Sequence, residues 1–587
     1  MLERTNVANE TVRRTRPAPA TEGRPFDLYT RANAGEVLPG LISPIAWSTI
    51  GQGLNQYFQD GMAKAGFKDA RRLRFATLYQ GRMYFNIGAL YEYYVQRAGA
   101  PSMAFLRSFG GPAGDQGLPL PERGLRWGRF IRYLPAMAKQ ARRQSRAPDN
   151  LRRAIPVIDD VARQLAALDL ERMDTAAIYH AMMDLVERVE AFTPVPNDCN
   201  SAAFGSYGTL AYLLASWFGN PGLANDLVAG LDMTKTAECS AELWGIARRA
   251  AAWADVRALV GRSAPEVMLD DLSEHPLGVS IAADLREFLA RYGHRAVDEL
   301  DIMNPRWAED PSPLLAVFKS YVVTPPAGDP SSVAARQRQV REAATARVHE
   351  LLRRRLIDRV FPWKRLLFRQ YLKRAQTFVP LREDPKFHLL KVFLPVRRCY
   401  LTLGRRFVDR GLLDAPEHIF FMVAEEVEDA SLGWEPDAPG LRERVRARLA
   451  DYERWSHLPI PWALGPDERP LQPDQAPRND TRILSGLAAS SGRVTGLARV
   501  ITDLRHADKM RQGEILVAPF TDPGWTPLFP LCAAIVTDLG GLLSHGAIVA
   551  REYGVPAVVN TGYATALVRS GDRITVDGSE GRVYLDT

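Results

Sequence analysis

The sequence is poor in cysteine, and the four that it contains lie far apart, at Cys199, Cys239, Cys399 and Cys532. No CxxC pair occurs, which argues against a disulfide framework or a thiolate metal site and predicts buried, reduced thiols. The sequence also has no apolar run of about 18 residues, so no transmembrane helix is expected. Its first residues lack the apolar stretch of a secretory signal. These absences predict a soluble, cytoplasmic protein without a metal site.

Histidine is scarce as well, at 9 of 587 residues, whereas the basic residues outnumber the acidic ones by 75 to 68. The excess positive charge is concentrated in residues 139–154 and 353–374. Such stretches are typical of solvated helix faces, but an anionic substrate or an acidic carrier protein would also fit them. Because no zinc finger and no basic region leading into heptads is present, we expect neither nucleic acid nor a membrane as a partner.

The hydrophobic pattern divides the chain into four parts. Residues 1–25 form a polar tail, and residues 26–463 carry the three-and-four spacing of packed amphipathic helices. One of these helices is expected to begin after a cap at Asp174, and another to span residues 331–361. Residues 464–482 are rich in Pro and Asp and predict a linker. Residues 483–587 alternate short strands with turns and one short helix, which predicts a small α/β domain.

That short helix begins at a histidine. In "TDLGGLLSHGAIVAREYGVP", Gly540 and Gly541 allow a tight turn after a strand, Ser544 occupies the cap position, and His545 lies in the first turn. The N-terminus of a helix favours negative charge, so it would stabilise a phosphoryl group on the imidazole. It would equally keep the imidazole neutral and able to act as a base. We therefore predict that His545 is the catalytic residue.

This motif resembles the phosphohistidine motif in the swivelling domain of phosphoenolpyruvate-utilising enzymes, and the preceding "ILVAPFTDPGWTPLFPLCAAIVTD" resembles the rifampicin phosphotransferases. "FDLYTRANAGEVLPGLISPIAWS", "RYGHRAVDELDIMNPRWAEDP" and "LREDPK" resemble the substrate-binding domain of that branch. The resemblance implies a large helical substrate-binding domain followed by a swivelling α/β domain. Family members normally begin with an ATP-grasp domain that phosphorylates the histidine. Since the sequence has no Walker-type loop and starts at the substrate domain, we expect that this chain lacks one.

Several other residues could face His545. His294, Arg295 and Glu299 lie close together in "GHRAVDELD" and form either an acid/base set or an ion-pair network between helices. The resemblance implies that Arg382 and Lys386 meet the charge of a transferring group, although a solvated turn would also explain them. The remaining candidates for substrate binding are Arg31, Asn33, Glu36, Arg306 and Trp525. Trp525, in a proline-fixed turn, would otherwise pack at the domain interface.

Two enzymatic functions remain open. The first, which we favour at this point, is an ATP-independent dehydratase or cyclase that acts on a bulky polyhydroxylated, polyketide-like intermediate and needs no cofactor. The second is a phosphotransferase in which a separate ATP-grasp subunit, with ATP and Mg²⁺, phosphorylates His545. A third, non-enzymatic hypothesis is a scaffold with a relic motif, against which the intact His545 and glycines argue.

Overall fold

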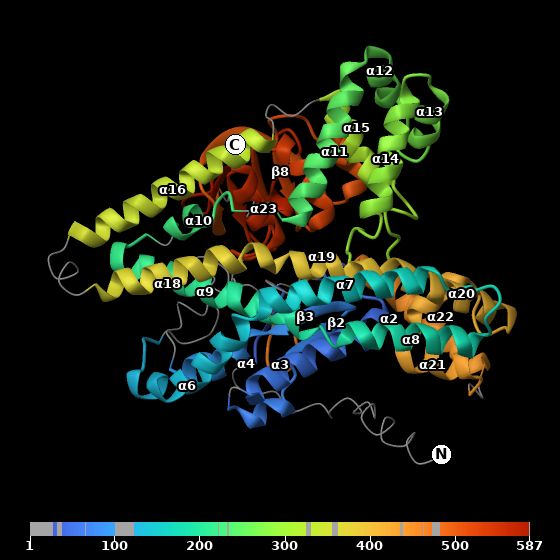
Figure 1. Ribbon diagram of the computed structural model, residues 1–587, viewed down its shortest axis with the longest axis horizontal. Helices are drawn as coiled ribbons and strands as arrows, with labels where there is room; N and C mark the ends of the chain where they lie inside the picture. The colour runs from blue at the N-terminus through green and yellow to red at the C-terminus, as the bar shows by residue number, and fades with distance from the viewer. Residues whose placement is uncertain are drawn as a thin grey trace.

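The computed structural model describes residues 27–31, 38–64, 66–99, 123–220, 222–231, 234–324, 330–354, 362–434, 438–458, 460–461, 463–471 and 482–585. The tail expected at residues 1–25 lies outside these ranges. The chain is mostly helical and ends in a small α/β region (Figure 1), which agrees with the fold class expected from the sequence. Among the described residues, no helix has both the length and the apolar character that a membrane span requires.

A four-stranded antiparallel sheet, which was not foreseen from the sequence, lies within the mostly helical part. Its order is β2 (Ala76–Tyr79), β3 (Arg82–Asn86), β1 (Tyr29–Thr30) and β4 (Ala463–Leu464). Gln80 and Gly81 join β2 to β3 with φ of 47° and 69°. Positive φ at both central residues is typical of a two-residue hairpin turn. The usual sequence of such a turn is Asn-Gly, so Gln-Gly did not indicate it.

The pairing of β4 with β1 ties the end of the first part to its beginning. Leu464 pairs with Tyr29 and is fully buried. The first residues of the expected linker, 464–471, therefore lie next to this sheet, whereas residues 472–481 fall outside the described ranges.

Helices make up most of the rest of this part. Asp174 caps α8 by accepting a hydrogen bond from the amide of Ala177 at 2.8 Å, as predicted. The helix expected over residues 331–361 is described as far as Arg354. The elements are α2 (Pro44–Ala46), α3 (Gln52–Lys64), α4 (Ile87–Tyr91), α6 (Trp127–Gln144), α7 (Ala147–Ala166), α8 (Thr175–Glu190), α9 (Pro194–Phe218), α10 (Leu223–Leu227), α16 (Pro330–Arg354), α18 (Trp363–Phe378), α19 (Asp384–Leu389), α20 (Phe393–Asp409), α21 (Ala424–Leu432) and α22 (Ala438–Ser456).

A separate group of helices covers one side of the C-terminal domain (Figure 1). Its members are α11 (Lys235–Ala252), α12 (Ala254–Arg262), α13 (Met268–Glu274), α14 (Gly278–Tyr292) and α15 (Ser312–Val323). Phe288 and Phe318 of this group share one apolar core with Leu528, Ile535 and Ala547 of the C-terminal domain. The two parts are therefore joined by buried apolar surface as well as by polar contacts.

The C-terminal domain contains an eight-stranded sheet in the order β5-β12-β11-β7-β8-β9-β10-β6. Strands β7 to β10 are parallel and the others pair antiparallel. The strands predicted from the sequence are present, whereas β5 and β6 were not expected. The bounds are β5 (Ile483–Ser485), β6 (Leu487–Ser490), β7 (Arg493–Val500), β8 (Ile515–Ala518), β9 (Ala534–Thr537), β10 (Ala557–Val559), β11 (Arg573–Asp577) and β12 (Arg582–Leu585), with helices α23 (His545–Tyr553) and α24 (Ala564–Leu567).

Candidate active site around His545

His545 is the first residue of α23, which follows β9 through the Gly-Gly turn. Ser544 Oγ accepts a hydrogen bond from the amide of Ala547 at 3.0 Å, so the predicted cap is confirmed. Gly540 has φ of 141°, and a Cβ there would lie 3.1 Å from the Cβ of Val559. Glycine is therefore required both by the backbone conformation and by the close packing of this turn.

Both ring nitrogens of His545 have a partner. Nδ1 lies 3.0 Å from Oε2 of Glu383, and Nε2 lies 2.7 Å from Oγ1 of Thr526. Thr526 belongs to the 3₁₀ helix η8 (Pro523–Leu531) of the same domain, whereas Glu383 precedes α19 in the helical part. The pair between Glu383 and His545 thus crosses the boundary between the two parts. His545 is 4% exposed.

Glu383 is held in its ionised form. Burial raises the pKa of this carboxyl, but His545, Arg382 and Lys386 outweigh burial and place the pKa well below its usual range. Arg382 Nη1 donates to the second carboxylate oxygen at 2.7 Å. Since an ionised carboxylate can only accept, Nδ1 of His545 carries a hydrogen, and in the neutral ring Nε2 accepts from the Thr526 hydroxyl.

Lys386 links this pair to a second buried carboxylate. Its Nζ lies 3.2 Å from Oε2 of Glu299, and Arg295 Nε donates to the other oxygen of Glu299. Arg295 also donates to Thr236 Oγ1 at 3.3 Å. Burial raises the pKa of Glu299, yet Arg295 and Lys386 lower it overall. The predicted residues Arg295, Glu299, Arg382 and Lys386 therefore form one charged network next to the imidazole.

A pair of buried aspartates also joins the two parts. The amide of Asp298 donates to Oδ2 of Asp522 at 2.9 Å, and Oδ1 of Asp522 accepts from the amide of Gly524 at 2.7 Å at the start of η8. Burial, followed by the charges of Asp522 and Asp301, raises the pKa of Asp298 well above its ordinary value. This contact fixes the helix that carries Thr526 against the loop that carries Glu299.

Three other predicted site residues, His294, Arg306 and Trp525, are buried. His294 packs edge-on against Phe387 at 4.9 Å, and burial lowers its pKa to about 3. Arg306 donates to the backbone oxygens of Glu299 and Asp301 at 2.7 and 2.8 Å. Trp525 is buried in the apolar core that the two parts share.

Arg31 is also buried, and it donates to the backbone oxygen of Pro39 at 2.6 Å. Two other predicted binding residues, Asn33 and Glu36, lie outside the described residues. Within the described ranges, no hydrogen bond or ion pair connects His294, Arg306, Trp525 or Arg31 to His545.

Glu383 and Thr526 are the site residues that the sequence did not single out. Both lie inside quoted stretches, Glu383 between Arg382 and Lys386 in "LREDPK" and Thr526 in "DPGWTP". The position of this glutamate between two cationic residues could have indicated that its carboxylate is buried in ionised form. Thr526 gives no such signal, because its role depends on the way η8 packs on α23.

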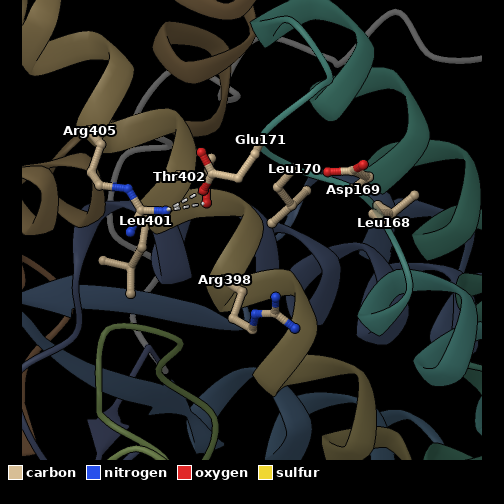
Figure 2. A pocket seen from close by; sticks show the side chains of 8 residues that line it. All are labelled: Leu168, Asp169, Leu170, Glu171, Arg398, Leu401, Thr402 and Arg405. Atoms are coloured by element: carbon tan, nitrogen blue, oxygen red, sulfur yellow. Dashed lines mark hydrogen bonds and ion pairs between the residues drawn. The ribbon is translucent and has the colours of Figure 1, made fainter.

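The described hollows do not reach the imidazole. Figure 2 shows one of about 250 Å³ between the loop after α7 and helix α20, where Glu171 lies 3.9 Å from Arg405. A much smaller hollow, of about 10 Å³, lies beside α23 and is lined in part by Ile548 and Glu552. With both ring nitrogens paired and 4% exposure, His545 is closed off from solvent in this arrangement.

Two family models match the chain. The rifampicin phosphotransferase fourth domain matches residues 198–383, which include Glu383, and the mobile domain of PEP-utilising enzymes matches residues 510–581, which include His545.

Curated relatives match as well. A rifampicin phosphotransferase of Streptomyces sviceus is 32% identical over 376 residues, which cover 63% of this chain and 42% of the relative. The prodigiosin synthesizing transferase PigC of Serratia marcescens is 29% identical over 601 residues, or 97% of this chain and 64% of the relative. The chondramide synthase cmdD of Chondromyces crocatus is 32% identical over 374 residues, which cover 60% of this chain and 9% of the relative. The chain thus spans 42% of the length of the rifampicin phosphotransferase that it matches.

Proposed function

Because the chain belongs to the family of rifampicin phosphotransferases and other phosphoenolpyruvate-utilising enzymes, we propose that it is a phosphotransferase that carries a phosphoryl group on His545. The observation that supports this proposal is the pairing of the two ring nitrogens, Nδ1 with Glu383 and Nε2 with Thr526. An imidazole with its hydrogen held on Nδ1 offers the lone pair of Nε2 as a nucleophile. This proposal replaces the dehydratase as the favoured hypothesis.

In the first half-reaction, Nε2 attacks the phosphorus of a phosphoryl donor. The bond from phosphorus to the leaving oxygen breaks, and its electron pair leaves with the donor product. The imidazole gains positive charge and keeps its Nδ1 hydrogen, which the Glu383 carboxylate stabilises. Thr526 must release Nε2 before the attack, because its hydroxyl occupies that lone pair in the docked arrangement.

In the second half-reaction, an acceptor hydroxyl attacks the phosphorus. The bond between Nε2 and phosphorus breaks, its electrons return to Nε2, and the hydroxyl proton passes to the imidazole and later to solvent. Arg382 and Lys386 are the cations closest to this carboxylate–imidazole pair. They are suited to neutralise the phosphoryl oxygens during transfer. Arg295 and Glu299 position Lys386 through their ion pairs.

The proposed donor and acceptor follow from the resemblance and the relatives. A separate ATP-grasp subunit with ATP and Mg²⁺ is the proposed phosphoryl source, because the resemblance pairs these two domains with such a domain. The proposed acceptor is a bulky, hydroxylated natural-product intermediate, since two relatives are a prodigiosin synthesizing transferase and a chondramide synthase. An acidic carrier protein remains a further proposed partner.

The test uses the purified full chain, an extract of the cells that naturally produce it, and radiolabelled ATP with Mg²⁺. We expect an alkali-stable, acid-labile label on the wild type, as phosphohistidine requires, and none on His545→Ala. The control is His506→Ala, an exposed histidine of the same domain, which should be labelled like the wild type. An unlabelled wild type or a labelled His545→Ala would contradict the proposal. Transfer of the label into a small-molecule extract would then identify the acceptor.

The dehydratase or cyclase stays a hypothesis with less support. It requires a proton donor besides His545, and His294, the residue expected for this task, has a pKa lowered to about 3 by burial. His294 would be neutral at physiological pH, and within the described residues it forms no hydrogen bond or ion pair with His545. Loss of water from a polyhydroxylated compound without any nucleotide, abolished in His545→Ala, would establish this function instead.

A further inference from the structure

Helix α6 presents an apolar stripe to solvent. Trp127, Ile131, Leu134 and Met137 are all exposed, and Trp127 is 66% exposed. Their spacing of four, three and three residues places them along one side of a helix. A monomeric protein rarely exposes such large apolar side chains in a row, and a contiguous exposed patch marks an interaction site.

The side chains next to this stripe are packed within the protein. Tyr133 stacks on Phe67 with ring centroids 4.8 Å apart, and Gln144 is buried and accepts a hydrogen bond from Arg374 at 2.9 Å. The helix is therefore anchored to the fold by one face. The stripe that begins at Trp127 is a second face, which no packing within the described structure explains.

The charged side chains of α6 itself are all basic, and Arg143 near its C-terminal end pairs with Asp198 of α9 at 2.6 Å. Eight Lys and Arg residues and no Asp or Glu lie between Arg123 and Arg146. Arg132, Lys139 and Arg142 are exposed on the helix and lie beside the apolar stripe. A helix with Trp, Ile and Leu on one side and only basic residues on the polar side is the pattern of helices that lie in the interface of a membrane with anionic lipids.

A second exposed apolar pair lies at the start of α18. Leu366 is 69% exposed and Trp363 is half-exposed, with ring centroids 6.1 Å from Trp217 of α9. Lys364, Arg365 and Arg369 surround this pair in the sequence. In Figure 1, α6 and the start of α18 both lie toward the left end of the molecule, and both helices pack on α9.

We propose that α6, assisted by the start of α18, docks the protein peripherally on a bilayer that contains anionic phospholipids. Trp127 and Ile131 would enter the region between headgroups and acyl chains, while Arg132, Lys139 and Arg142 contact the phosphates. Basic side chains beside an exposed apolar stripe suit a fluid, anionic surface better than a folded acidic partner, which would require individually matched pairs. This proposal departs from the expectation, drawn from the sequence, that no membrane is a partner.

Docking at this end would bring the substrate-binding helices close to lipophilic molecules dissolved in the bilayer. The residues of α6 are not among those that contact His545, so docking and phosphoryl transfer can be tested separately. Failure of either proposal leaves the other intact.

The experiment is sedimentation of the full chain with vesicles of phosphatidylcholine alone and of phosphatidylcholine with about one third phosphatidylglycerol. We expect binding only to the anionic vesicles, with weaker binding at higher salt. The double variant Trp127→Ser and Ile131→Ser should lower the partition coefficient at least about tenfold, given the apolar surface removed. Trp434→Ser is the matched control, because Trp434 is 67% exposed but lies after α21.

Absence of binding to anionic vesicles overturns the proposal, as does equal binding by wild type and double variant. Loss of binding in Trp434→Ser overturns it as well. Binding to poly-glutamate but not to vesicles, if it requires Trp127, would assign the surface to an acidic protein and overturn the lipid proposal. Unchanged circular dichroism of the double variant shows that its effect is not a loss of folding.

Discussion

At the scale of single residues, the contacts of the site depend on whether the carboxyl group of Glu383 is ionised. Its carboxylate accepts from His545 and Arg382, and its pKa lies well below the ordinary value of 4.5. A carboxyl with a depressed pKa stabilises the fold above its unfolded pKa, and this contribution is lost as the pH falls through the folded value. The ionised form is therefore fully stabilising at neutral pH.

We expect Glu383→Gln to lower the free energy of unfolding by about 1–3 kcal/mol at pH 7, because a buried arginine and imidazole lose their anion. The difference between wild type and variant should shrink as the pH falls below 4.5. Urea unfolding at pH 7 and at several acidic pH values measures it. Glu453→Gln, an exposed glutamate on α22, is the control and should leave the free energy unchanged. A loss that stays constant with pH would show that ionisation of Glu383 does not matter.

At the scale of elements, the turn before α23 is fixed by local geometry. Gly540 has φ of 141° with Val559 close to the position of a Cβ, whereas Gly571 has φ of 100° with open space around it. Alanine is strained at either φ, but only at Gly540 does it also meet a packed side chain.

We therefore expect Gly540→Ala to lower the free energy of unfolding by about 1–3 kcal/mol, and Gly571→Ala by less. Thermal or urea unfolding of the two variants beside the wild type measures the comparison. Equal losses would mean that the backbone conformation alone, and not the contact with Val559, makes glycine necessary before α23.

The elements that could be predicted from the sequence are those with a local signal. The cap at Ser544, the helix ending at Gly554 and the strands of the C-terminal domain follow from turn chemistry and alternation of apolar residues. The sheet of β1 to β4 could not be foreseen, since β1 and β4 have two residues each and meet only because distant parts of the chain pack together. Very short strands have too few residues to show a period.

The same distinction between local signals and long-range packing explains which residues of the site could be predicted. His545 and its glycines form a continuous motif, whereas Glu383 lies 162 positions away and reaches the imidazole through domain packing. The resemblance indicated that Arg382 and Lys386 belong to the site, but it could not predict where their side chains lie. The partner of Nε2, Thr526, depends on the orientation of η8, which no local pattern encodes.

At the scale of the whole molecule, we expect the contact between the two parts to respond to pH. Glu552 on α23 faces Thr234 at 3.5 Å, and burial, together with the charges of Glu383 and Asp384, raises its pKa to about 8. An acid with a raised pKa destabilises the docked state increasingly as the pH rises from its ordinary value of 4.5 to about 8, and the effect is constant above that. Docking should therefore weaken across this range.

We expect amide hydrogen exchange in α23, corrected for the intrinsic effect of pH, to show more frequent opening at pH 9 than at pH 6 in the wild type. In Glu552→Gln, the contribution of this group should vanish, because the amide cannot ionise, and the opening should change much less with pH. An identical pH dependence in wild type and variant would assign the effect to other groups, such as Asp298 and Asp522.

The apolar core that Phe288 and Phe318 share with Leu528 and Ala547 has a thermal consequence. If the C-terminal domain leaves the helices, this surface becomes hydrated, and hydration of apolar surface raises the heat capacity. The equilibrium between docked and released domains must then curve with temperature, with docking strongest at an intermediate temperature and weaker in the cold. Release of His545 would thus resemble a small unfolding reaction more than the turning of a free hinge.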